Sequence, residues 1–331
     1  MRVFVTHNPE DRLAYFGRAL PKLEAMAEVV TNPLDRDLTT DELIDAAAGC
    51  RVVVAHRSTP GAAELFAQSP DLLAFLRCAV DISTIDVEAA SAHGVLVARA
   101  DKSFVASTAE LALGLLIDCA RNISASTIDY HAGREPPQRS GRQIRGQTAG
   151  IIGYGAIGSY LADLLTSLGM KVLVHDPFVD AASDTVELVE LAELLARADA
   201  LFPLAPGGVE TTKLIGAEQL AAMKPGALLV NVSRGEVLDE VAVAEALDSG
   251  RLGGLGMDVG LGDDQRPSPG LAARSGVVAT PHLGGLTPEN ADAQAASAVE
   301  QVAAMIDGSI PPRAVNPDHA RRLQRFWAEA T

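Results

Sequence analysis

The chain has 331 residues, of which 48% are hydrophobic and 4% aromatic, and its formal net charge is −16 at pH 7. This length exceeds the size at which one hydrophobic core stops growing, so two domains are expected. The acidic balance, with no run of basic residues, argues against nucleic acid and against an anionic membrane surface as partners.

The N-terminus, the longest apolar segment and the cysteines bear on location. MRVFVTHNPE begins with a strand-like run and has no apolar core of the length found in signal peptides. LALGLLIDCA, from Leu111, is too short and too charged to cross a bilayer and is typical of a core helix. The three cysteines form no CxxC pair and the seven histidines show no HxxxH spacing. We expect a cytoplasmic protein, reduced and without a metal site.

Residues 1–99 alternate short apolar runs with helical patterns, among them RVFVTH, TDELIDAAAG, RVVVAH and VLVAR. Short apolar runs separated by amphipathic segments are typical of strands and helices in alternation. This pattern predicts a small α/β unit. Thr40 or Asp41 is expected to cap its helix at 41–48, since both residue types favour the N-cap.

A second series of elements follows. A helix is expected with Thr108 as its N-cap, and the polar, turn-rich segment 131–147 predicts an exposed connection. Strand–helix alternations then run from 148 to about 282, and a last helix covers roughly 288–307. The tail beyond it is expected to be irregular.

A dinucleotide-binding fingerprint occupies 149–178, AGIIGYGAIGSYLADLLTSLGMKVLVHDPF. An apolar strand leads into Gly153, Gly155 and Gly158, and a helix and a second strand ending in Asp176 follow. Glycines at this spacing permit a tight turn and let the backbone approach a pyrophosphate at the helix N-terminus. Asp176 can accept both hydroxyls of a ribose and would repel a 2′-phosphate, which predicts NAD rather than NADP.

Three charged or titratable residues come at the ends of later strands. Arg234 follows ALLVNVS, Asp258 follows GGLGM, and His282 follows GVVATP. The carboxyl ends of strands in a doubly wound sheet open onto one crevice. An Arg can bind a carboxylate and polarise a carbonyl, and a His can give a proton to the developing alkoxide. A carboxylate beside the His holds it in orientation and raises its pKa, so the three residues predict a site for hydride transfer to a carbonyl.

Five stretches carry a resemblance to a known family. They are STAELALGLLIDCAR (107–121), GIIGYGAIG (150–158), AAMKPGALLVNVSRGEVLDEVAVAEALDSGRLGGLGMDV (221–259), TPHLGG (280–285) and AVNP (314–317). Nearly end to end, the chain resembles the D-2-hydroxyacid dehydrogenases. The resemblance implies two Rossmann-like domains: an NAD-binding domain, 100–288, with a doubly wound parallel sheet, inserted into a smaller flavodoxin-like substrate-binding domain, 1–99 and 289–331. It also implies a homodimer joined through the NAD-binding domains.

The resemblance also assigns catalytic roles. Arg234 matches the family's substrate-binding Arg, and His282 its acid–base His. The family's catalytic Glu comes five residues after the position of Asp258, where this chain has Asp263, with Asp264 beside it. Either acid is a candidate partner for His282.

The substrate loop departs from the family pattern, which tends to have glycines in the stretch where this chain has Ala79, Val80 and Asp81, in CAVDISTID. Arg57, Val80 and Asp81, with Arg234 and His282, are the expected substrate contacts. Leu204 stands where the family often has a His. The expected cofactor contacts are Thr108, Gly153, Gly155, Ala156, Ile157, Gly158, Asp176, Pro177, Leu204, Pro206, Val232, Ser233, Arg234, Asp258, His282 and Gly284.

These features together predict an NAD-dependent oxidoreductase that interconverts a small 2-keto acid and the D-2-hydroxy acid by hydride transfer. Two alternatives remain. An NAD(H)-binding corepressor or sensor without turnover would fit the altered loops at 79–81 and 263–265. Formate oxidation ranks low and is suggested only by Gln265, which lies two positions beyond the one where that branch has its Gln.

Overall fold

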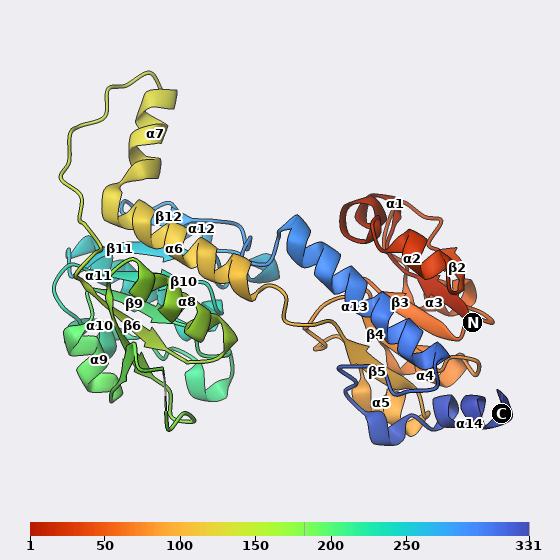
Figure 1. Cartoon of the computed structure of the whole chain (residues 1–331). Coiled ribbons are helices and arrows are strands. Elements are labelled where there is room, and N and C mark those ends of the chain that lie inside the picture. Colours follow the sequence, from red (N-terminus) through yellow and green to blue (C-terminus); the bar gives the residue numbers. More distant parts are fainter. Residues whose placement is uncertain (182, 331) are drawn as a thin grey trace. The chain divides into compact units, whose positions relative to one another are not determined.

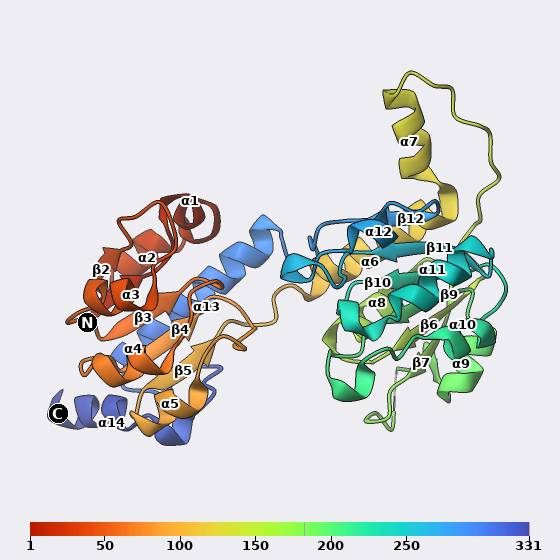
Figure 2. The same ribbon diagram turned by 180° about the vertical axis from the view of Figure 1, so that it is seen from behind.

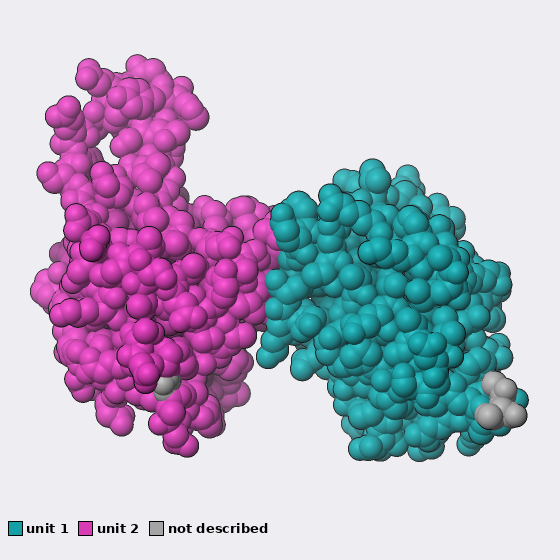
Figure 3. All heavy atoms as spheres, viewed as in Figure 1, with its two compact units in different colours: residues 1–103, 288–331 teal, residues 104–287 magenta. Residues whose placement is uncertain are grey.

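A computed structural model describes residues 1–181 and 183–330, which form two compact units (Figures 1 and 3). Unit 1 comprises Met1–Ser103 and Pro288–Thr331, and unit 2 comprises Phe104–Thr287. Each unit has its own parallel sheet covered by helices, which confirms the predicted α/β fold class.

Unit 1 is built on a five-stranded sheet of order β2-β1-β3-β4-β5, the flavodoxin-like order. Every strand pair in it is parallel. β3 and β4 are buried along their whole length, as apolar runs covered on both faces must be. The strands are β1 (Arg2–Val5), β2 (Glu28–Thr31), β3 (Val52–Ala55), β4 (Ala74–Arg77) and β5 (Leu96–Arg99).

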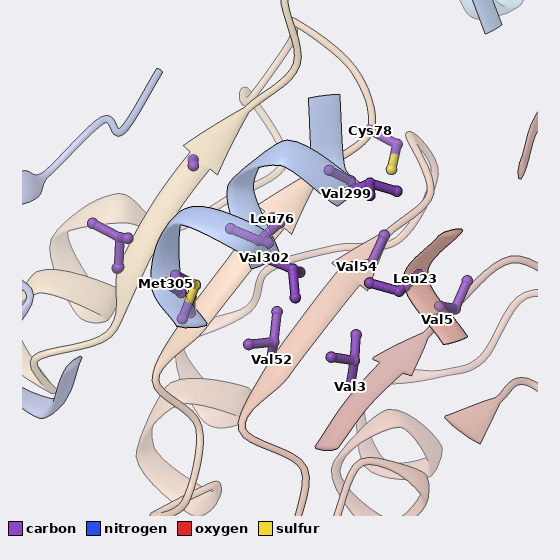
Figure 4. Packing of buried hydrophobic residues seen from close by; sticks show 14 of the residues in the cluster. Val3, Val5, Leu23, Val52, Val54, Leu76, Cys78, Val299, Val302 and Met305 are labelled. Atoms are coloured by element: carbon purple, nitrogen blue, oxygen red, sulfur yellow. The ribbon is translucent and has the colours of Figure 1, made fainter. Parts of the chain in front are cut away.

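Helices cover both faces of this sheet. On one face, α2 (Leu20–Glu24) and α13 (Pro288–Ile306) pack on the alternate residues of the strands. Figure 4 shows Val299, Val302 and Met305 of α13 above the sheet that carries Val52 and Leu76. Each such side chain contributes roughly 1.5–3 kcal/mol by burial. The opposite face carries α3 (Thr40–Ala46), α4 (Ala63–Gln68) and α5 (Val87–Ala92).

The cap of α3 and the C-terminal tail differ from the sequence predictions. Thr39, rather than Thr40 or Asp41, is the N-cap, because it forms a reciprocal capping box with Glu42.

The prediction of an irregular tail is wrong, since the chain forms α14 (Arg321–Ala330). Leu323 is fully buried, and Phe326 and Trp327 pack against the unit 1 core. The indole N–H of Trp327 donates to the carbonyl of Met305 at 2.8 Å. Three apolar residues at helical spacing therefore form a helix inside a segment rich in arginine.

Unit 2 is built on a seven-stranded sheet of order β12-β11-β10-β9-β6-β7-β8, and all its pairs are parallel. The chain runs outward from β6 to β8, then returns to β9 on the other side of β6. This reversal places a crevice at the carboxyl ends of β6 and β9. The strands are β6 (Thr148–Ile152), β7 (Lys171–His175), β8 (Val186–Leu188), β9 (Ala200–Pro203), β10 (Ala227–Asn231), β11 (Leu252–Met257) and β12 (Val277–Ala279).

The helices of unit 2 form a layer on each face of the sheet. One layer holds α6 (Val105–Arg121) and α8 (Ala156–Ser167). The other holds α9 (Leu191–Arg197), α10 (Ala217–Ala222) and α11 (Glu240–Asp248), and α12 (Pro269–Ala272) precedes β12.

The expectation that Thr108 caps the second helical region is wrong, because α6 begins one turn earlier, at Val105. The Thr108 amide donates to the carbonyl of Phe104 within the helix, and its side chain is buried. Tertiary burial has overridden the local preference of Thr for the cap.

The helix α7 (Ile123–His131) and the coil that follows it to residue 147 project from the rest of unit 2 (Figures 1 and 2). No residue of α7 is buried. Asn122, in the left-handed conformation with φ of 55°, separates α7 from α6. No single described helix has the length and apolar character to cross a bilayer. α6 and α7 meet that test only as a pair, bent by 71°.

Candidate active site

The glycine loop after β6 is shaped as a phosphate-binding turn. Gly153 has a φ of +97°, a conformation that L side chains rarely adopt. A Cβ on Gly158 would lie 2.2 Å from the Gly153 carbonyl oxygen, so only glycine permits this close approach of helix and turn. Gly155 faces open space, with nothing within 4 Å of its Cβ position. The N-terminus of α8 is therefore accessible to a pyrophosphate, which fits a dinucleotide.

Asp176 is fixed beside this loop. One oxygen of its carboxylate accepts the backbone N–H of Tyr154 at 2.7 Å, and the other accepts that of Phe178 at 2.9 Å. A carboxylate has about four lone-pair sites, so acceptor capacity remains for ribose hydroxyls. The half-buried side chain follows β7, as the fingerprint requires.

The other residues expected at the cofactor lie in unit 2 around the same strand ends. The loop after β9 packs against the glycine turn: the Cβ position of Gly153 is 2.9 Å from the carbonyl carbon of Leu204. Gly284 lies beside Thr108, whose hydroxyl is 3.3 Å from the Gly284 Cβ position. The remaining expected contacts follow β6, β7, β9 and β10: Ala156, Ile157, Pro177, Pro206, Val232 and Ser233.

Arg234 stands on a rigid turn after β10. The fully buried Asn231 donates from its amide to the Arg234 carbonyl at 2.9 Å and accepts the Ser233 N–H at 3.0 Å. The Ser233 hydroxyl donates to the carbonyl of Pro203 at 2.7 Å, which ties the turn to β9. Arg234 itself is exposed. The backbone of the turn is therefore held in place, and the Arg234 side chain that it carries is exposed to solvent.

The turn is also locked to the loop after β11. A Cβ on Gly235 would lie 2.2 Å from the Gly260 backbone, and one on Gly260 would lie 2.6 Å from Pro267. Only two residues without side chains allow this approach. Any separation of the loop that carries Arg234 from the loop that carries Asp263 would therefore lose this packing.

Asp258 holds the loop that carries His282. Its carboxylate is buried and accepts three hydrogen bonds: from the Thr280 hydroxyl at 2.6 Å, the Leu283 N–H at 2.7 Å and the Gly284 N–H at 2.8 Å. Its backbone carbonyl accepts the His282 N–H at 2.9 Å. Bonds of N–H and O–H donors to a carboxylate are the stronger kind. Asp258 thus ties down the loop next to His282, and its expected role as the acid that orients His282 stays a prediction.

His282 has a φ of 62°, which is unusual for a residue with a side chain. Its Nδ1 pairs at 2.8 Å with the backbone carbonyl oxygen of Asp264. Asp264 and the next residue, Gln265, are also left-handed, with φ of 54° and 56°. Such conformations cluster where the surrounding structure must hold a functional geometry.

The expected partner loop is therefore present, but it meets Nδ1 of His282 through its backbone instead of through a carboxylate. The side chains of Asp263 and Asp264 are exposed. Because a carbonyl oxygen only accepts, Nδ1 carries a hydrogen and the proton to be exchanged belongs to Nε2.

In unit 1, the expected substrate residues also follow neighbouring strands. Arg57 is exposed in the loop after β3, and Val80 and Asp81 follow β4. The Asp81 carboxylate accepts the Ser83 N–H at 2.8 Å. The sequence did not identify Arg77, the last residue of β4, whose guanidinium lies behind both loops; a lone Arg inside the apolar run LLAFLRC was the available signal.

A polar cluster lies at the carboxyl ends of β1 and β3. Ligand-type atoms of Asp11, Asp37 and His56 lie within 4.8 Å of one another, although no sequence spacing suggested it. Nδ1 of His56 pairs with the Ser58 hydroxyl at 2.7 Å, so hydrogen bonds within the loop account for its orientation. His7 packs edge-on against His56, and burial, with a smaller effect of His56, lowers the pKa of His7 to about 3.

Comparison with known proteins identifies relatives over most of the chain. Residues 113–284 match the family model described as "D-isomer specific 2-hydroxyacid dehydrogenase, NAD binding domain". The D-3-phosphoglycerate dehydrogenase of Mycobacterium tuberculosis is 37% identical over 281 residues, which is 83% of this chain and 53% of that protein. The chain thus spans about half the length of this curated relative.

Two further relatives match over nearly their whole length. The (S)-sulfolactate dehydrogenase of Chromohalobacter salexigens is 38% identical over 282 residues, covering 81% of this chain and 91% of that protein. The crystal structure of the TT0316 protein of Thermus thermophilus has a TM-score of 0.82 at 30% identity, covering 95% of this chain and 100% of that one.

Proposed function

Because the chain belongs to the D-isomer specific 2-hydroxyacid dehydrogenase family, whose matched domain binds NAD, we propose that it interconverts a small 2-keto acid and the D-2-hydroxy acid. One observation carries the proposal: Arg234, the buried Asp258 and His282 follow the carboxyl ends of the adjacent strands β10, β11 and β12. We further propose that unit 2 is the NAD-binding domain and unit 1 the substrate-binding domain. A cytoplasmic location stays a prediction.

The chemistry divides between two side chains. When bound, NADH supplies a hydride to the carbonyl carbon of the keto acid. Arg234 binds the substrate carboxylate with its planar fork and polarises the adjacent carbonyl. His282 donates the Nε2 proton to the carbonyl oxygen, which becomes the hydroxyl, and takes it back in the oxidative direction.

The orientation of His282 depends on the backbone around it. The carbonyl of Asp264 accepts a hydrogen bond from Nδ1, and the carboxylate of Asp258 accepts the N–H groups of Leu283 and Gly284 in the loop that carries His282. A fixed second hydrogen bond sets the tautomer and ring direction of a working histidine. Asp263 and Asp264 are kept as secondary candidates for a carboxylate near His282.

The substrate is proposed to carry a second anionic group. Two relatives are named for phosphoglycerate and sulfolactate, which bear a phosphate and a sulfonate besides the carboxylate. Arg57 is the exposed cation on the unit 1 loop proposed to meet that group. The carboxylate of Asp81, where the family has glycine, repels anionic groups that approach it and so reduces the range of anionic substrates that can bind.

The test is a panel of 2-keto acids with NADH: glyoxylate, pyruvate, hydroxypyruvate, phosphohydroxypyruvate and sulfopyruvate. We expect turnover, with the doubly anionic acids preferred. Arg234→Lys should lower kcat/KM about 100-fold or more, because the bidentate, charge-assisted pair is lost, while the Kd for NADH changes little. Arg266→Lys, an exposed Arg in unit 2, is the matched control. Normal turnover by Arg234→Lys would remove this residue from the site.

The panel also separates the alternatives. Tight NADH binding with no turnover of any acid would favour a corepressor or sensor. Formate added with NAD tests the remaining alternative, formate oxidation. Gln265, the residue that suggested it, is exposed on the loop after β11.

We propose a homodimer formed through α7. Ile128 and Tyr130 of this helix are 62% and 65% exposed, and a nine-residue helix without buried residues has little stability of its own. A second copy would cover it. Ile128→Asp with Tyr130→Asp should halve the mass in analytical ultracentrifugation, whereas Val209→Asp, at a site 95% exposed elsewhere in unit 2, should not. A dimer unaffected by the double variant would place the interface elsewhere.

A further inference from the structure

Arg77 is an unusual residue for the end of a buried strand. It is the last residue of β4, only 1% exposed, and the largest fully buried side chain among the described residues. An arginine is almost never buried to this degree unless its charge is matched by partners. The hydrogen-bond partners of its guanidinium therefore indicate its role.

The guanidinium of Arg77 joins two loops. Nη1 donates to the backbone carbonyls of His56 and Arg57, each at 2.5 Å. Nη2 donates to the carbonyl of Thr59 at 2.7 Å and to the hydroxyl of Thr84 at 2.9 Å. The first three acceptors belong to the loop after β3, and the fourth to the loop after β4.

The loop at 56–59 is thereby held on two sides. On the side of β1, the Thr6 hydroxyl accepts the His56 N–H at 2.9 Å and pairs with the Thr59 hydroxyl at 2.7 Å. On the side of β4, three backbone carbonyls of the loop accept hydrogen bonds from the guanidinium of Arg77. A planar fork of five N–H groups can donate to several carbonyls at once in a fixed geometry, whereas a Lys ammonium offers three donors on a flexible stem.

The charge of Arg77 persists in this buried position. Burial lowers the pKa of Arg77 to about 10, and the neighbouring Cys78 and Asp81 act in the opposite direction. The guanidinium is therefore charged at neutral pH. It also partly offsets the negative charge that Asp81 places on the loop after β4.

We propose that Arg77 is a positioning residue for substrate binding, which fixes the loop that carries Arg57 to the loop that carries Val80 and Asp81. The proposal rests on the proposed function, in which these loops meet the keto acid. Two loops held in one arrangement before binding lose less conformational entropy when the substrate arrives. Loss of the clamp should therefore weaken substrate binding more than it slows the chemical step.

The first experiment compares Arg77→Lys with a matched control. Lys keeps the charge but offers one compact ammonium in place of the fork. Arg322→Lys is the control, because Arg322 also donates to three backbone carbonyls of unit 1, those of Phe66, Ser69 and Leu72. We expect Arg77→Lys to raise the KM for the keto acid at least about tenfold with kcat within about threefold, and Arg322→Lys to change neither. An unchanged KM in Arg77→Lys would overturn the proposal.

A double-mutant cycle with Arg57→Ala tests whether Arg77 acts through that residue. In the Arg57→Ala background, Arg77→Lys should raise KM by no more than about twofold, because coupled residues are not additive. The same fold-change in both backgrounds would show that Arg77 supports the unit in general and not the placement of Arg57.

Thr84→Val is the milder variant, for use if Arg77→Lys does not fold. It removes only the hydroxyl that ties Arg77 to the second loop, at an exposed position. KM should rise about threefold, as for the loss of one hydrogen bond. No rise in KM would contradict the coupling of the two loops.

Hydrogen exchange supplies a readout that does not need activity. Amides in 56–59 and 79–84 should exchange at least about tenfold faster in Arg77→Lys than in the wild type or in Arg322→Lys. Unchanged exchange would refute the clamp. If the wild-type protein reduces no keto acid, the proposed function fails, and the exchange data still decide whether Arg77 holds these loops.

Discussion

Replacement of Asp258 by Asn tests how the His282 loop is held. The side chain keeps its size but loses its charge, and one oxygen becomes an NH2 group. Because both carboxylate oxygens accept hydrogen bonds, the amide must face at least one donor among Thr280, Leu283 and Gly284. At least one bond is lost, and the others become neutral–neutral bonds of about half the strength.

The magnitude follows from these contacts. A hydrogen bond to a charged group contributes about 1.5–3 kcal/mol, and the site is buried, so a facing donor is left without water. A neutral Asn recovers part of the cost of burying the charge. We expect the loop at 280–284 to be destabilised by about 2–4 kcal/mol, which corresponds to roughly 30- to 1,000-fold more frequent opening.

Hydrogen exchange at Leu283 and Gly284 measures this opening directly. The value of kcat/KM should fall because the loop that opens carries His282. Asp163→Asn, at an exposed acid of α8 in the same unit, should leave both quantities near wild type. If the free energy of opening the 280–284 loop in Asp258→Asn lies within about 0.5 kcal/mol of the wild-type value, the idea that this carboxylate holds the loop is refuted.

Three further predictions concern the cofactor and pH. Asp176→Ala should raise kcat/KM with NADPH relative to NADH, because repulsion of the 2′-phosphate is removed; an unchanged ratio in steady-state assays would contradict this. Gly158→Ala should destabilise unit 2 by about 1–3 kcal/mol in urea unfolding, since its Cβ would lie 2.2 Å from a carbonyl oxygen, whereas Gly155→Ala, with open space around it, should weaken NADH binding without destabilising the fold. His7, with a pKa of about 3 when folded, binds fewer protons than the unfolded chain below pH 6.5, so its stabilising effect is present above that pH and is lost as pH falls toward 3. His7→Phe should therefore reduce the slope of the unfolding free energy against pH by up to about 1.4 kcal/mol per pH unit between pH 6 and 4. Unfolding can be followed by the fluorescence of Trp327, the chain's single tryptophan. Parallel plots of unfolding free energy against pH for the wild type and the variant would show that His7 does not titrate this way.

The sequence by itself determined the features that depend on local pattern. Apolar runs separated by amphipathic segments predicted the parallel α/β class, and the spacing of Gly153, Gly155 and Gly158 predicted the turn that the structure contains. The positions of Arg234 and His282 after strands were also evident, because a strand's end is marked by where its apolar run stops. Each of these features is encoded within a few residues.

Only the tertiary structure decided how the site residues are supported. The carbonyl of Asp264, rather than a carboxylate, meets Nδ1 of His282, and every residue type has such a carbonyl, so no letter in the sequence marks it. Arg77 and Asp258 bond to groups tens of residues away or to backbone atoms, and their roles appear only when the strands are side by side. Local patterns specify elements, but the partners of a buried charge are set by which elements pack together, since burial itself is a property of the folded chain.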